Sequence, residues 1–426
     1  MIKQYEQIGE SLQMTTLENG LRVCYIPKTD FSKTFAMLAT DFGSVDASFT
    51  MDGVRYDTPA GVAHFLEHKM FEDEDGNALQ KFGVTGASPN AFTSHTMTAY
   101  HFSCTSDFEK NLEILLKFVY TPYFTEENVE KEKGIIGQEI GMMEDMPTWQ
   151  AYVGMFEGLY AEHPVRISIA GSVESIAPIT PELLFRCHEA FYSPSNMILV
   201  VCGTADFERV VEMARELTPK TSKQIAARHY GVRRPVVYQS EVLRKMQVSQ
   251  PYFMLGIKDI PVQAGESATR RNILGELTAR IVCGQTAPLF TKLYEEGLLN
   301  RRFETGYSLL PEGALALFGG ESADPRAVRT QIEQTIRTLH QNGVPKDLFE
   351  RMKNAMYGTY IRLMDDLEEI CRLQVEAGFR GENFGDFAEL FGTITLADVQ
   401  EMLTRWAQSD RTALSMILPR SQEGEA

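Results

Sequence analysis

Short apolar runs alternate with amphipathic stretches along the first half of the chain. The pair Asn19-Gly20 stands between two such runs, which predicts a β-hairpin, and residues 34–40 predict a further strand. A helix is expected to begin at Pro59 and run past His68, because Asp57-Thr58 offers a cap and proline suits the first helical position. The chain is therefore predicted to begin in a sheet and then to pass into a helix.

The apolar spacing keeps changing between strand and helix periods beyond this helix. Residues 91–103 are rich in threonine and aromatic side chains and predict a strand, whereas residues 108–118 carry apolar side chains at helical spacing. A further helix, capped by Thr125, is expected to continue to about Met143. Strands and helices mixed in this way indicate the α+β class.

The second half of the chain repeats the outline of the first. Thr180 and Thr395 each follow an isoleucine, open a helix-like segment that leads into an apolar strand, and lie 215 positions apart. A similar shift places residues 125–139 over residues 345–359, and both segments begin with a helix-start residue. A repeat this long indicates duplicated domains and excludes a solenoid, whose repeats span about 20 to 50 residues.

The predicted boundary between the two copies is a polar, basic stretch with two prolines. We therefore expect an N-terminal domain over residues 1–217, a linker over 218–235 and a C-terminal homologous domain over 236–426.

The charge balance narrows the classes of partner. The chain has 41 Lys and Arg against 58 Asp and Glu, a net charge of −17, so phosphate backbones are repelled and nucleic acid is not an expected partner. Six cysteines lie far apart without a CxxC pair, which is typical of buried thiols in a reducing compartment. The first residues lack an apolar signal core, and no run approaches the roughly 18 apolar residues of a membrane span. We expect a cytoplasmic protein without membrane contact.

The candidate chemistry lies in the first copy. His64, Glu67 and His68 stand at i, i+3 and i+4, so on a helix they share one face and the two imidazoles can bind one metal ion. A catalytic zinc needs one more protein ligand and leaves its fourth position to water. Glu67 is then placed to take a proton from that water as general base. The alternative is a helix that carries two surface histidines.

The third ligand is expected on the helix that follows Thr125. Glu132 and Glu139 lie seven positions apart and share a face of that helix, and the apolar neighbours of Glu139 predict that its carboxylate is buried. The alternative is a solvated acidic helix, because charged runs usually face water.

These residues resemble the insulinase/pitrilysin family of zinc peptidases, the inverzincins. The resemblance rests on the inverted motif His64-x-x-Glu67-His68, on Glu132 and Glu139, and on three further segments. These segments are Asn90-Ala91-Phe92-Thr93, His163-Pro164 through Gly171, and Tyr192 through Met197.

The resemblance implies a role for each residue of the motif. It makes His64, His68 and Glu139 the ligands of one zinc ion per chain, Glu67 the general base, and Glu132 a carboxylate that supports the site from behind. The second copy has no HxxEH motif and carries Met352 and Thr359 opposite Glu132 and Glu139, so only the first copy is expected to be catalytic. The family's fold implies two homologous domains, each a mainly antiparallel β-sheet backed by helices, that form half of a clam-shell chamber.

The sequence around the motif most resembles that of the bacterial Ymf-type processing-peptidase-like proteins. These proteins occur as pairs in which one member carries the zinc site. In paired members of the family an arginine and a tyrosine hold the substrate, but Tyr294 and Arg301 stand in the opposite order here. One interpretation is that a partner chain supplies the grip, either a homologous chain without the zinc motif in a heterodimer or a second copy of this chain in a homodimer. The other is that Tyr307 and Arg302 supply it from a shifted register.

The expected substrate is a small unfolded peptide. An edge strand at Asn90, Ala91, Phe92 and Thr93 would bind an extended chain by β-augmentation, although Pro89-Asn90 is also compatible with an ordinary strand entry. His95 and His101, nearby, are expected to be structural. One alternative function is that of a non-catalytic assembly subunit. The other is that of an accessory protein in the modification of elongation factor P, because Ymf-type pairs have been named for an association with that modification.

Overall fold

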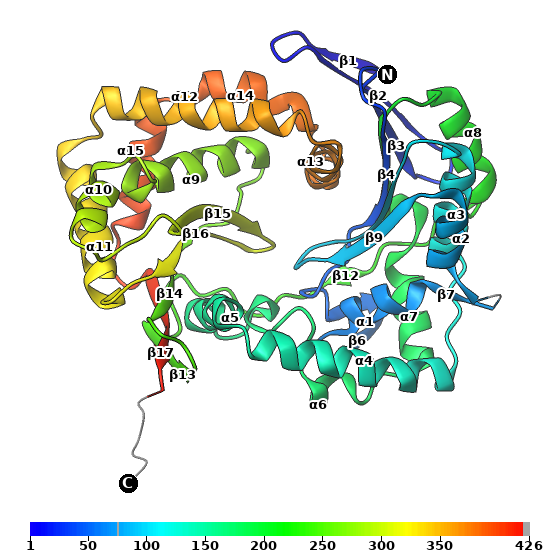
Figure 1. Cartoon of the computed structure of the whole chain (residues 1–426), viewed down its shortest axis with the longest axis horizontal. Coiled ribbons are helices and arrows are strands. Elements are labelled where there is room, and N and C mark those ends of the chain that lie inside the picture. The colour runs from blue at the N-terminus through cyan, green and yellow to red at the C-terminus, as the bar shows by residue number, and fades with distance from the viewer. Residues whose placement is uncertain (75, 421–426) are drawn as a thin grey trace. The chain divides into compact units, whose positions relative to one another are not determined.

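The computed structural model describes residues 1–74 and 76–420, which form two compact units (Figure 1). Unit 1 consists of residues 1–140, 168–229 and 360–388. Unit 2 consists of residues 141–167, 230–359 and the chain from residue 389 onward. Each unit therefore takes in a segment from the other half of the sequence.

Unit 1 is built on a seven-stranded sheet. Its strands, in spatial order, are β1 (Ile2–Tyr5), β2 (Glu10–Thr16), β3 (Arg22–Pro27), β11 (Met197–Gly203), β4 (Thr34–Thr40), β10 (Thr98–Cys104) and β9 (Ser88–Thr93). Strand β11 runs parallel to β3, and the other neighbours are antiparallel. Strand β9 ends the order, so one side of its backbone is open within the described residues.

Unit 2 repeats the last five strands of that order. Its sheet runs β13 (Glu241–Met246), β17 (Thr412–Pro419), β14 (Tyr252–Asp259), β16 (Gly313–Glu321) and β15 (Glu304–Leu310). The parallel pair β13 and β17 corresponds to β3 and β11, and every other pair is antiparallel, as in unit 1. The prediction of two copies of one mixed fold, each a sheet backed by helices, is confirmed.

The helices also recur in matching places along the two copies. The first copy has α1 (Val62–Met70), α2 (Ala78–Thr85), α3 (Phe108–Tyr120), α4 (Glu126–Glu144), α5 (Pro147–Leu159), α6 (Val173–Ile176), α7 (Pro181–Phe191) and α8 (Phe207–Leu217). The second has α9 (Ala268–Cys283), α10 (Pro288–Glu295), α11 (Pro325–Asn342), α12 (Lys346–Leu363), α13 (Leu367–Phe379), α14 (Phe387–Thr393) and α15 (Leu396–Trp406). The Thr180 and Thr395 side chains cap α7 and α15, as the 215-residue offset predicts.

Short elements complete the described residues. A three-stranded sheet contains β12 (Ala227–Arg228), β5 (Ser48–Met51) and β6 (Val54–Asp57), and β7 (Glu72–Asp73) pairs with β8 (Gly76–Asn77). Three 3-10 turns span Pro164–Arg166, Pro194–Asn196 and Phe384–Asp386. None of the helices within residues 1–74 and 76–420 is both long and apolar enough to span a bilayer.

The equivalent helices α5 and α13 are exchanged between the units. Helix α5 packs on β13, β14 and β17 of unit 2, and α13 packs on β4 and β11 of unit 1. Glycines allow the close approach: a Cβ on Gly158 of α5 would lie 2.9 Å from the Ala413 Cβ, and one on Gly378 of α13 would lie 2.7 Å from Ile198. Because the compact units cross the predicted boundaries 1–217, 218–235 and 236–426, that division stays a prediction about sequence homology.

The predicted hairpin and central strands are confirmed. Gly20 takes the left-handed conformation at φ 87° in the turn between β2 and β3, and residues 34–40 and 197–203 are strands. The single strand predicted over 91–103 is wrong, because β9 and β10 form a hairpin. The Ser94 amide donates to Met97 O at 2.8 Å and closes its turn.

Candidate metal centre

Helix α1 starts later than the sequence predicts. Its N-cap is Gly61 at φ 90°, and the proposed cap at Asp57 instead ends strand β6. Gly61 is required there twice over, since a side chain would be strained at that φ and its Cβ would lie 2.4 Å from the carbonyl oxygen of Ala170. A Cβ on Gly171 would likewise lie 2.5 Å from the carbonyl oxygen of Ala60, so the segment that ends at Gly171 packs closely against the entry to α1.

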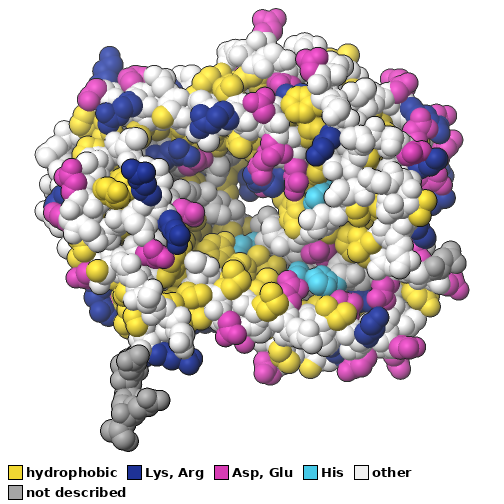
Figure 2. Space-filling model, viewed as in Figure 1, with side chains coloured by type: hydrophobic (Ala, Val, Ile, Leu, Met, Phe, Trp, Pro, Cys, Tyr) yellow, Lys and Arg dark blue, Asp and Glu magenta, His cyan; other side chains and the backbone are white. Residues whose placement is uncertain are grey.

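Three donor side chains come together where α1 faces α4. One ligand atom from each of His64, His68 and Glu139 lies within 4.8 Å of the others, and this group is the candidate metal cluster found within the described residues. His64 Nε2 is 3.6 Å from Glu139 Oε1, and His68 Nε2 is 3.5 Å from Glu139 Oε2. In the view of Figure 2, histidine side chains reach the surface beside acidic ones near α1 and α4.

This donor set fits zinc. Two imidazole nitrogens and one carboxylate oxygen are a combination found at catalytic zinc sites, and ligands about 2.0–2.1 Å from a tetrahedral ion lie about 3.3 Å from one another. The two distances to the Glu139 oxygens are close to that spacing. Glu139 is less buried than the sequence predicts, because 32% of its side chain is exposed. A donor at the solvent side would leave a path for water to a bound ion.

Glu132 fixes the orientation of the His68 ring. Its Oε1 is 3.1 Å from His68 Nδ1, so that nitrogen donates to the carboxylate and Nε2 is left as the nitrogen that could bind an ion. Burial raises the pKa of Glu132, but its bonds and charge contacts with His68 and Lys69 outweigh burial and leave the pKa below its ordinary value. Glu132 therefore stays ionised, which is the form that accepts from His68.

Lys69 supports Glu132 from inside the unit, a contact that sequence reasoning missed. Its side chain is fully buried and its Nζ lies 2.7 Å from Glu72 and 3.5 Å from Glu132. The sequence feature that could have indicated this contact is the place of Lys69 directly after the motif, on a side of α1 that faces the core.

Glu67 lies on the same face of α1 and is held by strand β9. The Thr93 hydroxyl donates to Glu67 Oε2 at 2.7 Å. Burial raises the pKa of Glu67 above its ordinary value, while the charge of His64 and the Thr93 hydrogen bond act in the opposite direction. A carboxyl with a raised pKa is suited to exchange protons near neutral pH. The sequence placed Thr93 in the substrate strand, and the structure adds its contact with Glu67.

The other predicted substrate residues lie on the open edge. Asn90, Ala91 and Phe92 pair with His101, Tyr100 and Ala99 of β10, and Asn90 is exposed. Proline is tolerated in such an edge strand, which accounts for Pro89 inside β9.

The remaining histidines near this strand do not join the donor cluster. His101 is buried against Phe35 with its Nε2 3.8 Å from Glu368, and burial lowers its pKa to about 4. His95 Nδ1 contacts the Ser44 hydroxyl at 3.1 Å. Both contacts are compatible with the predicted structural roles.

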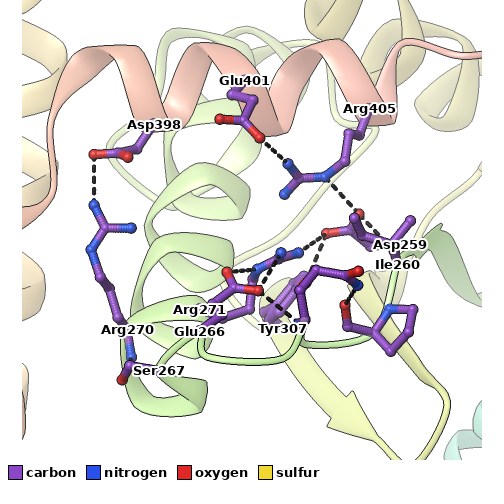
Figure 3. A network of polar contacts seen from close by, with 12 residues as sticks. Asp259, Ile260, Glu266, Ser267, Arg270, Arg271, Tyr307, Asp398, Glu401 and Arg405 are labelled. Carbon is purple, nitrogen blue, oxygen red and sulfur yellow. Dashed lines mark hydrogen bonds and ion pairs between the residues drawn. The ribbon is translucent and has the colours of Figure 1, made fainter.

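The alternative grip at Tyr307 is disfavoured by its contacts. The Tyr307 hydroxyl donates to Asp259 at 2.8 Å inside a polar network of unit 2 (Figure 3), so it is already engaged. Arg302 is 83% exposed, and Tyr294 and Arg301 are also exposed.

Comparison with known proteins shows the family. A model of the insulinase family, peptidase family M16, matches residues 49–171, and a model described as the peptidase M16 inactive domain matches residues 178–356. A protein of Bacillus subtilis (strain 168) that is named the uncharacterised zinc protease YmfH is 37% identical over 429 residues, which cover 99% of this chain and all of the relative. The chain belongs to the insulinase family. Relatives named zinc proteases support a peptidase, and the predicted resemblance is confirmed.

Solved structures of insulinase-family proteins share the fold. An M16-like peptidase from Alicyclobacillus acidocaldarius superposes with a TM-score of 0.92 at 34% identity, over 96% of this chain and 99% of that one. Pitrilysin superposes with a TM-score of 0.75 at 18% identity, and this chain covers 45% of its length. The second match shows the fold alone.

Proposed function

We propose that this chain is a zinc-dependent endopeptidase that hydrolyses small unfolded peptides. The observation that carries the proposal is the convergence of His64, His68 and Glu139 beside a buried Glu67 on one face of α1. A helix with two merely superficial histidines would need neither the Glu132 bond nor the carboxylate from α4.

His64, His68 and Glu139 would hold the ion. When bound, zinc supplies Lewis-acid chemistry that polarises the scissile carbonyl. Glu67 takes a proton from the attacking water as the new C–O bond forms, and then gives it to the amide nitrogen as the C–N bond breaks. Thr93 holds one carboxylate oxygen of Glu67 and thereby orients the other for this transfer.

Strand β9 supports the choice of substrate. An extended peptide can add to its open edge through main-chain hydrogen bonds, which suits unfolded peptides and excludes folded proteins. Asn90, Ala91, Phe92 and Thr93 would line that peptide. Enclosure of the peptide in a chamber stays a prediction from the family.

A homologous partner chain is part of the proposal. Tyr294 and Arg301 depart from the expected order, and the hydroxyl of Tyr307 is engaged within unit 2. This chain also covers 45% of pitrilysin, so a pair of such chains approaches the length of that relative. We propose a dimer with a chain that lacks the zinc motif. The six described cysteines are free and buried, in keeping with a cytoplasmic location.

The alternative is a non-catalytic assembly subunit, or an accessory protein of elongation factor P modification. The inactive-domain model over residues 178–356 leaves that alternative open. The four residues His64, Glu67, His68 and Glu139 favour the peptidase, because a scaffold needs none of them.

The test is cleavage of a mixed library of unstructured peptides, followed by mass spectrometry. The zinc-loaded chain is assayed alone and mixed with a homologous chain that lacks the motif, with and without a chelator, and H68A serves as the metal-free control. We expect chelator-sensitive cleavage that H68A lacks. Cleavage that persists with the chelator would contradict the proposal. So would the absence of cleavage both by the chain alone and by its mixture with the homologous chain.

A further inference from the structure

A small basic pocket lies within unit 2, apart from the residues of the metal centre, which all belong to unit 1. It has a volume of about 50 Å³ and is lined by Tyr160, Arg233, Lys258, Arg411 and Gly313, among other residues. A water molecule needs about 10–15 Å³ of such space, so the pocket holds a group of a few heavy atoms.

The Tyr160 hydroxyl has no hydrogen-bond partner within residues 1–74 and 76–420, although the residue is only 6% exposed. It reaches the pocket, because a Cβ built on the lining residue Gly313 would lie 2.9 Å from the hydroxyl oxygen. Burial raises the pKa of Tyr160, so the group stays protonated and able to donate. Leaving a buried donor unpaired is costly, by about 1–3 kcal/mol, and an acceptor in the pocket would remove that cost.

Three cations line the same pocket and form no ion pair in the described part of the chain: Arg233, Lys258 and Arg411. Lys258 Nζ lies 4.4 Å from the centre of the Tyr160 ring and donates to two carbonyls, Leu159 O and Val236 O. Arg411 Nη2 donates to the neutral amide of Gln408. The positive charge of these groups is therefore not neutralised by a bonded acid.

The acidic residues that line the pocket are largely committed elsewhere. Glu162 forms an ion pair with Arg234 at 2.9 Å. Asp259 faces Tyr307 and Arg405, which it accepts from at 2.8 and 3.0 Å, as Figure 3 shows. Glu312 is the remaining carboxylate of the lining.

The pKa of Lys258 reflects the excess of cations around it. Burial first, and then the charges of Arg411, Arg233 and Arg234, lower its pKa to about 8. No acidic group is among the causes, so cations dominate at this point of a chain whose net charge is −17.

We propose that this pocket binds a phosphoryl group, either as inorganic phosphate or as the phosphate of a monoester. The lining carries four cations, Arg233, Arg234, Lys258 and Arg411, against three carboxylates, Glu162, Asp259 and Glu312, so it has one positive charge in excess. A phosphate monoester carries about −1.5 to −2 at neutral pH. The tyrosine hydroxyl and the three cations that form no ion pair are all donors, which suits an ion that only accepts. Arg233 is exposed, so the pocket is open to a phosphate carried by a larger molecule.

The test is isothermal titration of the zinc-loaded chain with inorganic phosphate, O-phosphoserine and acetate. We expect saturable binding of the two phosphates and at least tenfold weaker binding of acetate, which has one charge. Tighter binding of O-phosphoserine than of inorganic phosphate would identify a monoester as the natural form, and the reverse order would identify free phosphate.

Variants separate this pocket from other anion sites. Y160F should weaken phosphate binding about tenfold or more, because it removes a hydrogen bond to a charged group. It should not lower the melting temperature without phosphate, since the hydroxyl has no partner to lose. R411Q should also weaken binding, whereas the surface control R215Q and the metal-free H68A should bind as the unaltered chain does. Absence of saturable phosphate binding, equal binding of acetate, or unchanged binding by both Y160F and R411Q would overturn the proposal.

Discussion

The two copies of the fold differ in how the polar side chains at the helix and edge strand of each sheet are bonded. In unit 1, α1 packs on the edge strand β9, and its polar groups are left able to take up something more: three donors converge and a third of Glu139 is exposed. In unit 2, the equivalent helix α9 packs on β15, and Arg271, Asp259 and Tyr307 bond mainly to one another and to their neighbours (Figure 3). One fold can thus leave the polar groups of its helix and edge strand able to bind an ion in one copy and bond them internally in the other.

The long helices α4 and α12 show the same difference. Helix α4 contributes Glu132 and Glu139 to the donor cluster, whereas Met352, at the matching position of α12, is a buried apolar residue. Helix α4 carries two carboxylates, and α12 has none at the matching positions. This difference assigns the proposed metal to the first copy.

The largest expected effect comes from removing the general base. E67Q should lower peptide cleavage by about 10²–10⁴-fold, because general acid-base catalysis contributes about that much, while His64, His68 and Glu139 still bind zinc. Cleavage rates and zinc content are measured on the same sample. Unchanged cleavage, or loss of the metal, would refute the role given to Glu67.

Breaking the closed network of unit 2 should affect stability and leave the metal in place. Asp259 has a fully buried side chain and accepts from Tyr307, Arg405 and the Ile260 amide. D259N removes the charge that balances two arginines, so urea unfolding should show a loss of about 3–5 kcal/mol. The matched control E241Q breaks a surface pair and should cost at most about 1 kcal/mol. Equal stability of the two variants would remove the contrast between the copies.

Glu132 should have a smaller effect, on metal affinity. E132Q weakens the acceptor that orients His68, and loss of such a partner reduces affinity about 10–100-fold. Competition with a chromogenic chelator measures that change. If E132Q binds zinc as tightly as the unaltered chain does, Glu132 does not support the metal site and its role is only structural.

The smallest expected effect concerns Thr93 and appears as a shift with pH. The Thr93 hydroxyl stabilises ionised Glu67, so T93V should raise the pKa of that carboxyl further. Because the base works in its ionised form, the acid limb of the pH profile of kcat/KM should move to higher pH, with a few-fold loss near neutrality. A shift to lower pH, or none, would contradict the contact.

The sequence predicted elements whose signals are local and missed features that depend on packing. Asn19-Gly20, the apolar run 197–203 and the capping threonines Thr180 and Thr395 carry their own turn, strand and cap chemistry, and each is found as predicted. The predicted start of α1 is wrong because the helix begins at Gly61, where Ala170 leaves no room for a side chain, and no local pattern reveals that approach.

The candidate site divides in the same way. Helical spacing predicted that His64, Glu67 and His68 share a face. The partial exposure of Glu139, the bond from Thr93 to Glu67 and the buried Lys69 arise from tertiary packing between separate elements. A one-dimensional pattern indicates which residues can meet, but not how far each is buried when they do.

The most direct test of the central claim is the zinc content of the folded chain by native mass spectrometry. The account predicts one zinc ion per chain in the unaltered protein and none in H68A, with the fold retained because α1 is formed by packing around Gly61 and not by the ion. Two ions per chain, or one that persists in H68A, would contradict the assignment of a single metal centre to the first copy.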